Sequence, residues 1–78
     1  MTREQIIETL SSGDVRFTYR KKNGTEREAY GTRNTDIITL NDAMPKGTGT
    51  EKIGVIAYYD LEKQGWRSFN EENFVEFL

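Results

Sequence analysis

The side chains best suited to binding chemistry are basic residues crowded into one stretch of the chain. Between residues 16 and 33, six lysines and arginines stand against two glutamates, whereas from residue 34 onward eight acidic residues outnumber four basic ones. The net charge of −2 conceals this asymmetry. Fixed positive charge at repeated spacing is what contact with a phosphate backbone requires. The stretch is therefore a candidate binding surface, with an ordinary solvated face as the alternative interpretation.

Catalysis and metal binding have little support in the composition. The chain has no histidine and no cysteine, so the most common acid–base catalyst and the usual ligands of a structural zinc site are missing. Carboxylates are plentiful, but no spacing places two of them as a defined acid–base pair. We expect no catalytic residues, no metal and no cofactor, and predict that the protein is not an enzyme.

The length and the hydropathy pattern limit the architecture and the location. A chain of 78 residues predicts a single domain over residues 1–78. No apolar run approaches the roughly 20 residues that cross a bilayer, and residues 1–5 carry no apolar signal segment. Zero cysteine fits a reducing compartment. We expect a cytoplasmic protein without membrane contact, and its oligomeric state stays open.

A short helix is predicted at the start of the chain, over about residues 3–11. Thr2 and Gln5 have the spacing of a capping box, and Ser11-Ser12-Gly13 supplies the end. Between them Ile6, Ile7 and Leu10 form one apolar stripe. A helix this short is marginal alone in water, so the stripe must pack on another element.

The basic stretch that follows predicts a β-hairpin. Apolar and polar residues alternate from 15 to 20, and Asn23-Gly24 is the strongest short-range hairpin signal, typical of a two-residue type I′ turn. That turn places Phe17 opposite Tyr30 and Arg20 opposite Arg27. On this register one face of the hairpin carries its basic side chains: Arg16, Arg20, Lys22 and Arg27.

The second half of the chain predicts another hairpin and a short last strand. Residues 53–59 are apolar on both faces, residues 60–65 form a turn, and residues 66–69 return. In this register Tyr59 faces Trp66, Tyr58 faces Arg67, and Ile56 faces Phe69. Residues 71–73 look like a tight turn before a strand over 74–78.

A long loop is predicted between the hairpins, over about residues 33–52. Only residues 37–40 could hold a short turn or strand, and residues 41–52 are expected to be the most mobile internal segment. With strands confined to residues 14–78, the pattern describes a mainly β fold, an SH3-like (Sm-like) five-stranded barrel with a short N-terminal α-helix.

Two further places could bind a partner. Tyr59 beside Trp66 would form an aromatic patch, either an exposed platform for a base or protein, or a surface covered by the predicted helix. Because that helix needs a partner, we expect it to cover the patch. Arg67 shares its face with Tyr58, so it should point toward the barrel interior near one end. There it either contacts an anion or pairs with Asp60 or Glu62.

Several segments resemble a small stand-alone family related to WYL domains, found in bacteria and phages. They are Lys21-Lys22-Asn23-Gly24-Thr25, residues 45–50, Tyr58-Tyr59-Asp60 and Gly65-Trp66-Arg67-Ser68-Phe69, and the similarity covers the chain from about Phe17 onward. The resemblance implies an Sm-like SH3 β-barrel. Larger WYL domains are implicated in binding nucleic acid or an anionic ligand through aromatic and arginine side chains, which points to Tyr58 and Arg67. The W-Y-L triplet itself reads Ala57-Tyr58-Tyr59 here.

Two functional hypotheses follow. The first is a non-catalytic binding module that contacts nucleic acid or an anionic ligand through Arg16, Arg20, Lys22, Arg27, Tyr58 and Arg67. The second is a protein-interaction or structural adaptor of phage or mobile-element origin, which would use an edge strand or the Tyr59 and Trp66 patch.

Overall fold

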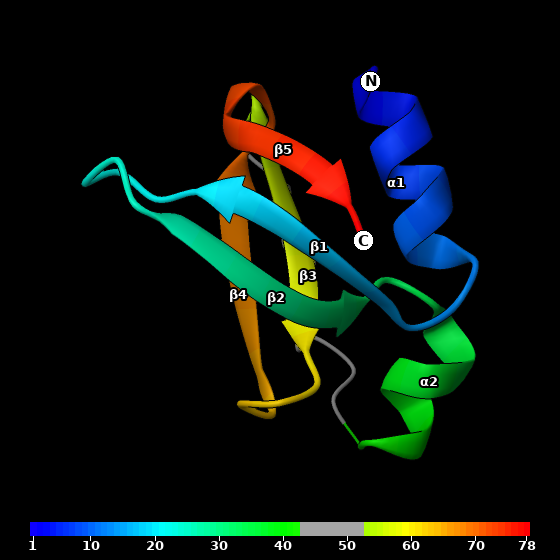
Figure 1. Cartoon of the computed structure of the whole chain (residues 1–78). Helices are drawn as coiled ribbons and strands as arrows, with labels where there is room; N and C mark the ends of the chain where they lie inside the picture. Colours follow the sequence, from blue (N-terminus) through cyan, green and yellow to red (C-terminus); the bar gives the residue numbers. More distant parts are fainter. Residues whose placement is uncertain (43–52) are drawn as a thin grey trace.

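The computed structural model describes residues 1–42 and 53–78 (Figure 1). Its elements in chain order are α1 (Arg3–Ser11), β1 (Val15–Arg20), β2 (Glu26–Thr32), α2 (Thr35–Leu40), β3 (Val55–Asp60), β4 (Gly65–Asn70), the 3-10 turn η1 (Glu71–Asn73) and β5 (Phe74–Phe77). The predicted mobility of residues 41–52 falls almost entirely on a segment outside the described residues.

The strands form one antiparallel sheet in the order β4-β3-β2-β1-β5. The sheet curls, so that the β1–β2 hairpin crosses in front of β3 and β4 (Figure 1). The β2–β3 pairing is short and consists of Gly31 opposite Asp60 and Thr32 opposite Tyr59. Beyond these pairs the two strands diverge and leave the barrel open on one side. The prediction of an N-terminal helix followed by five antiparallel strands is confirmed.

Helix α1 closes the aromatic core of the curled sheet. Its capping box is present as predicted, with the Thr2 side chain and the Gln5 side chain each accepting from a backbone N–H. Ile6 and Leu10 are buried in one cluster with core residues from four strands: Phe17, Tyr19, Ala29, Ile56, Tyr58 and Phe69. Arg3 anchors the first turn by donating to the Val55 carbonyl at 2.9 Å and contacting Glu71 at 3.1 Å.

The expectation that this helix covers Tyr59 and Trp66 is wrong. These two rings contact each other edge-to-face, with centroids 5.9 Å apart, but neither belongs to the cluster that receives Ile6 and Leu10. Tyr59 is 4% exposed and Trp66 is 41% exposed. The helix packs on the inner face of the sheet instead, because the stacked rings there offer it the larger apolar surface.

The register of the first hairpin differs from the prediction by one residue. Phe17 lies opposite Ala29, Tyr30 lies opposite Arg16, and Arg27 lies opposite Tyr19. The loop has three residues, because Lys21 N–H donates to the Thr25 carbonyl at 2.8 Å and the left-handed conformation is confined to Gly24, with φ +87°. This is a type I turn followed by a glycine bulge, which the same dipeptide also supports.

Of the other local predictions, one is confirmed and one is wrong. The second hairpin has the predicted register throughout, including Tyr58 opposite Arg67 and Ile56 opposite Phe69. The predicted loop 33–52, however, contains helix α2. Asn34 caps it by accepting from the Ile37 N–H at 3.1 Å, and Ile38 is buried. Capping and burial therefore outweigh the strand preference of the β-branched residues in this segment.

Candidate functional site

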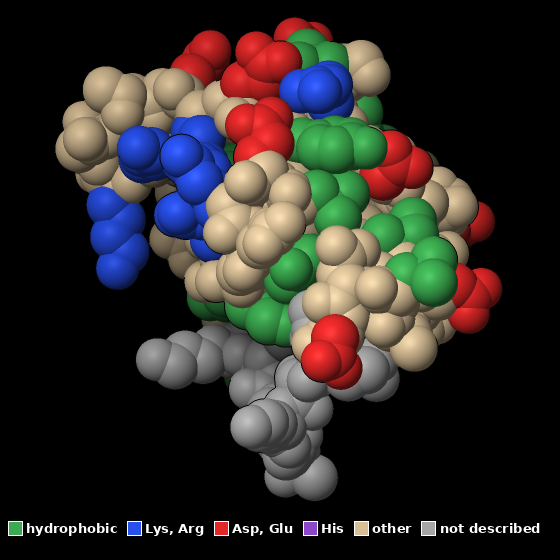
Figure 2. Space-filling view, turned by 90° about the horizontal axis from the view of Figure 1, so that it is seen from below, with side chains coloured by type: hydrophobic (Ala, Val, Ile, Leu, Met, Phe, Trp, Pro, Cys, Tyr) green, Lys and Arg blue, Asp and Glu red, His purple; other side chains and the backbone are tan. Residues whose placement is uncertain are grey.

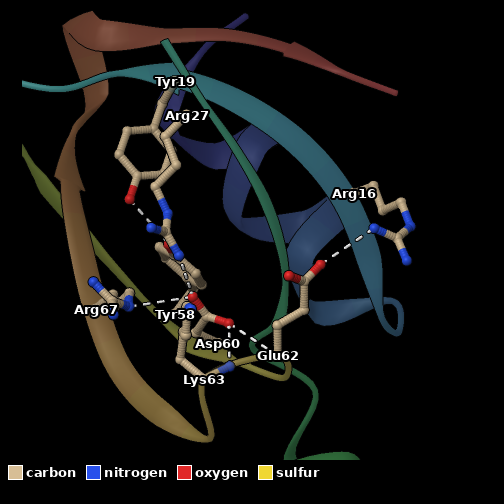
Figure 3. A network of polar contacts seen from close by, with 8 residues as sticks. All are labelled: Arg16, Tyr19, Arg27, Tyr58, Asp60, Glu62, Lys63 and Arg67. Carbon is tan, nitrogen blue, oxygen red and sulfur yellow. Dashed lines mark hydrogen bonds and ion pairs between the residues drawn. The ribbon is translucent and has the colours of Figure 1, made fainter. Parts of the chain in front are cut away.

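Asp60, at the end of β3, organises the polar centre of the molecule (Figure 3). Its side chain is 1% exposed. One carboxylate oxygen, Oδ1, accepts from the backbone N–H groups of Glu62 and Lys63 at 2.9 and 3.0 Å, which fixes the β3–β4 turn. The other, Oδ2, lies 2.7 Å from Arg27 Nη2 and 3.2 Å from Arg67 Nε. One carboxylate therefore holds two guanidinium groups, and the cluster keeps a surplus positive charge.

Arg27 is the more enclosed of the two arginines. Its side chain is 19% exposed, and its Nε is buried without a hydrogen-bond partner among the described residues. Burial alone would lower the pKa of Arg27, but nearby Tyr58, Tyr19 and Asp60 outweigh that effect and raise it. The guanidinium is therefore a permanent charge with unused donor capacity.

Two tyrosines lie beside Arg27. The hydroxyl groups of Tyr19 and Tyr58 are 3.0 Å apart and share a hydrogen bond. Burial, followed by this hydrogen bond, raises the pKa of Tyr58 far above its usual value. The Tyr58 hydroxyl is therefore protonated at neutral pH, as that of an ordinary tyrosine is. The two tyrosines beside Arg27 therefore carry no charge, and the only negative charge in contact with it is that of Asp60.

A cleft of about 570 Å³ lies between the β1–β2 hairpin and strand β4. It is lined by Tyr19, Arg20, Lys21, Lys22, Arg27, Val55, Arg67, Ser68, Phe69, Asn70 and Asn73. These side chains include five cations and no carboxylate. Figure 2 shows lysine and arginine side chains gathered on the hairpin side of the molecule. We call this site the basic cleft.

The basic cleft brings together four of the six residues predicted for the anion site. Arg20, Lys22, Arg27 and Arg67 line it directly. Tyr58 is not a lining residue, but its hydroxyl group is hydrogen-bonded to that of Tyr19, which does line the cleft.

Arg16, the sixth predicted residue, lies elsewhere. It sits over the Tyr30 ring at 4.5 Å and contacts Glu62 at 3.4 Å. The predicted like-charge pair of Arg20 and Arg27 is absent, since Arg20 lies opposite Glu26. The one-residue change of register explains the absence of this pair, because it moves Arg27 opposite Tyr19 and lets it reach Asp60.

Lys21 is a cleft residue that the sequence reasoning missed. On the predicted register it faced Glu26 and lay outside the basic face. The signal that could have found it is the Lys21-Lys22 dipeptide itself, because a glycine bulge lets consecutive side chains near a turn reach the same hollow. Arg67 pairs with Asp60, which was one of the two alternatives for it, and it also lines the cleft.

A second, mixed site lies between α1, β1 and the last strand. Asp14, Arg16 and Tyr30 line a hollow of about 470 Å³ together with apolar residues near the C-terminus. The Tyr30 hydroxyl donates to the Asp14 carboxylate, which lowers the pKa of Asp14 and raises that of Tyr30. Arg16 in this hollow faces one carboxylate, that of Glu62, whereas in the basic cleft the single carboxylate of Asp60 faces two guanidinium groups.

Within residues 1–42 and 53–78, no three histidine, cysteine, aspartate or glutamate side chains are grouped so that they could hold a metal ion. No helix in the same residues is both long enough and apolar enough to span a bilayer.

Comparison with known proteins identifies the class of protein that this fold defines. The model of the WYL_2 family, described as an Sm-like SH3 beta-barrel fold, matches residues 3–75. The chain belongs to this family, which confirms the resemblance and the SH3-like barrel. It is also similar to an uncharacterized 11.5 kDa protein in the Gp31-cd intergenic region of Enterobacteria phage T4, with 28% identity over 75 residues, which cover 94% of this chain and 74% of the phage protein. No solved structure matches the chain.

Proposed function

We propose that this protein is a non-catalytic binding module whose basic cleft takes the phosphate groups of a nucleic acid or of a free anionic ligand. The observation that carries this function is the lining of the cleft, which holds five cations and no carboxylate, while the buried Asp60 balances only one of the two charges of Arg27 and Arg67. Like charges gathered in one concave place repel one another, so an anion that neutralises them gains affinity from every one.

The arginines at Asp60 are held ready for such an anion. Asp60 accepts from one nitrogen of each guanidinium. Arg27 also hydrogen-bonds Tyr58, whereas the more exposed Arg67 keeps N–H groups that can donate to a ligand. Because the arginine forks are fixed before the ligand arrives, little side-chain entropy is lost on binding. Phosphate oxygens are the acceptors that paired guanidinium groups suit best.

A salt titration tests this function. We expect a fluorescently labelled oligonucleotide to bind at low ionic strength, with affinity that falls steeply as salt rises, because phosphate contacts release counterions. Separate arms with single-stranded oligonucleotide, duplex, pyrophosphate and inorganic phosphate distinguish nucleic acid from a free anion. Absence of binding by every one of these probes at low salt would remove the proposed function.

A matched pair of variants shows whether the cleft is responsible. Arg20→Gln and Arg16→Gln remove the same charge from the same strand, at side chains that are both more than half exposed. Only Arg20 lines the basic cleft. We expect Arg20→Gln to weaken binding and reduce the salt slope by about one, and Arg16→Gln to leave both unchanged. Equal losses in the two variants would point to nonspecific attraction.

A protein-interaction adaptor is the second candidate. Strand β4 is one edge of the sheet, and its exposed residues include Trp66. An edge strand with an exposed aromatic suits strand addition by a partner chain. The adaptor is favoured if no phosphate probe binds and if Trp66→Ala leaves the melting temperature unchanged.

A further inference from the structure

The tip of the β1–β2 hairpin contains a chemically reactive pair of residues. Asn23 is followed by Gly24, and the chain has four further asparagines, none of which precedes a glycine. A backbone nitrogen that follows an asparagine can attack the side-chain amide carbon, since a stable cyclic imide results. Glycine offers the least hindered nitrogen for this attack, because it has no β-carbon and the widest backbone freedom.

The hairpin tip is open to solvent. It projects from the curled sheet (Figure 1), and residues 21–26 are all exposed. Among the described residues, nothing lies within 4 Å of the place that a β-carbon on Gly24 would take. The Gly24 N–H donates to the Lys21 carbonyl at 2.9 Å, and this bond must open before the nitrogen can attack. Because an exposed loop tip opens at little cost in free energy, the bond slows the attack without preventing it.

The side-chain amide of Asn23 is polarised by its neighbour Thr25. Asn23 Oδ1 accepts from the Thr25 N–H at 3.1 Å and from the Thr25 hydroxyl at 2.6 Å. Attack on the amide carbon, Cγ, places negative charge on Oδ1. Two donors aimed at an oxygen where charge develops favour such a step, as in an oxyanion hole. Thr25 therefore assists the attack by Gly24.

We propose that Asn23 is a site of spontaneous deamidation assisted by Thr25. The Gly24 nitrogen gives its proton to hydroxide and bonds to Asn23 Cγ, the Cγ–Nδ2 bond breaks, and the departing nitrogen takes a proton from water and leaves as ammonia. A water molecule then opens the cyclic imide at either carbonyl. The product is aspartate, or isoaspartate, in which the backbone runs through the former side chain. One water is consumed, one ammonia is released, and a neutral amide becomes a carboxylate.

The new carboxylate would lie at the edge of the basic cleft. Lys21 and Lys22, which line the cleft, directly precede Asn23. A negative charge next to these cations lowers the positive potential at the hairpin end of the cleft. The modification needs no enzyme, and it holds whether or not the cleft binds a phosphate.

Peptide mapping of the full chain after incubation at neutral pH tests the site. We expect the mass gain of an amide-to-carboxylate change to accumulate about tenfold faster at Asn23 than at Asn41, which is also exposed but precedes Asp42, because Gly24 has no side chain to hinder the attack. The rate at Asn23 should rise with hydroxide concentration. Equal rates at Asn23 and Asn41 would overturn the assignment of the site.

A matched pair of variants tests the role of Thr25. Thr25→Ser keeps the hydroxyl and should deamidate at nearly the wild-type rate. Thr25→Val keeps the shape of the side chain without the hydroxyl, and should deamidate about fivefold more slowly, the factor that one typical hydrogen bond gives. Both changes lie at the exposed tip, so we expect the circular dichroism spectrum of the folded chain in each. Equal rates in the two variants would overturn the assistance by Thr25.

Discussion

Arg27 and Arg67 share a single oxygen, Oδ2 of Asp60, although they come from different strands, β2 and β4. The contact joins the two hairpins across the open side of the barrel. It also combines two roles in one residue, because the same aspartate fixes the β3–β4 turn through Oδ1. The stability of the fold and the charge of the basic cleft therefore depend on the same side chain.

Replacing this carboxylate should destabilise the protein strongly. Asp60→Asn keeps an oxygen that can accept from the turn N–H groups but removes the negative charge from two guanidiniums, one of them largely buried. We expect a loss of about 3–5 kcal/mol in unfolding free energy, the usual cost of breaking a buried ion pair. Urea titration measures it. Arg67→Gln is the control and should cost at most about 1 kcal/mol, because the Arg67 side chain is 43% exposed. Similar values for both variants would contradict the central place of Asp60.

Gly31 should not tolerate a side chain. A β-carbon at this position would collide with the Tyr58 ring and lie 2.8 Å from the Tyr59 carbonyl oxygen, which is backbone and cannot move aside alone. We expect Gly31→Ala to cost roughly 1–3 kcal/mol in unfolding free energy. Gly13→Ala is the matched control, because open space surrounds that position. Thermal melting curves that coincide for the two variants would show that β2 and β3 do not approach so closely.

The aromatic patch should respond unequally to truncation. Tyr59 is 4% exposed, so Tyr59→Ala should cost about 3–5 kcal/mol, as for other buried aromatic residues. Trp66 is 41% exposed, so Trp66→Ala should cost only about 1–2 kcal/mol, mainly the ring contact with Tyr59. Denaturation midpoints compare the two. A larger loss for Trp66→Ala would place that ring in a second core.

The Tyr30–Asp14 contact should contribute stability over a defined pH range. The hydrogen bond lowers the folded-state pKa of Asp14 below the ordinary value of 3.8, so its contribution is present above that value and is lost as the pH falls through the folded pKa. It also raises the pKa of Tyr30 above 10.0, so that contribution is present below 10.0 and is lost as the pH rises through the folded pKa. Unfolding free energies of the wild type and Tyr30→Phe, measured against pH, should differ most at neutral pH and converge at both extremes. A difference that does not depend on pH would mean that Tyr30 acts through packing alone.

The elements that were predicted correctly from the sequence are those whose local signals are compatible with only one structure. The capping box at Thr2 and Gln5 defined α1, and the turn from Asp60 to Gly65 left one register for the second hairpin. Asn23-Gly24 is compatible with two turn types that differ by one residue, and local sequence does not choose between them. The choice depends on tertiary packing, because only the observed register directs Arg27 toward Asp60.

The same ambiguity limited the prediction of the site. Sequence reasoning gathered the basic side chains on one face of a hairpin, whereas the structure gathers them between that hairpin and β4. The distance between Arg27 and Arg67 depends on how far the sheet curls, and no spacing in the sequence encodes that curl. Helix α2 was missed because residues 37–40 favour strands, although Asn34 carried a capping signal.

The short pairing between β2 and β3 has a mechanical consequence. Beyond the two residue pairs of the backbone ladder and one further bond, from the Leu61 N–H to the Tyr30 carbonyl, the two hairpins are joined by side-chain contacts, above all those of the arginines with Asp60. A ligand that contacts both Arg27 and Arg67 would add a further connection between the two hairpins. Occupancy should then stiffen both hairpins at once, so that amide hydrogen exchange slows in β2 and β4, far beyond the atoms that the ligand touches.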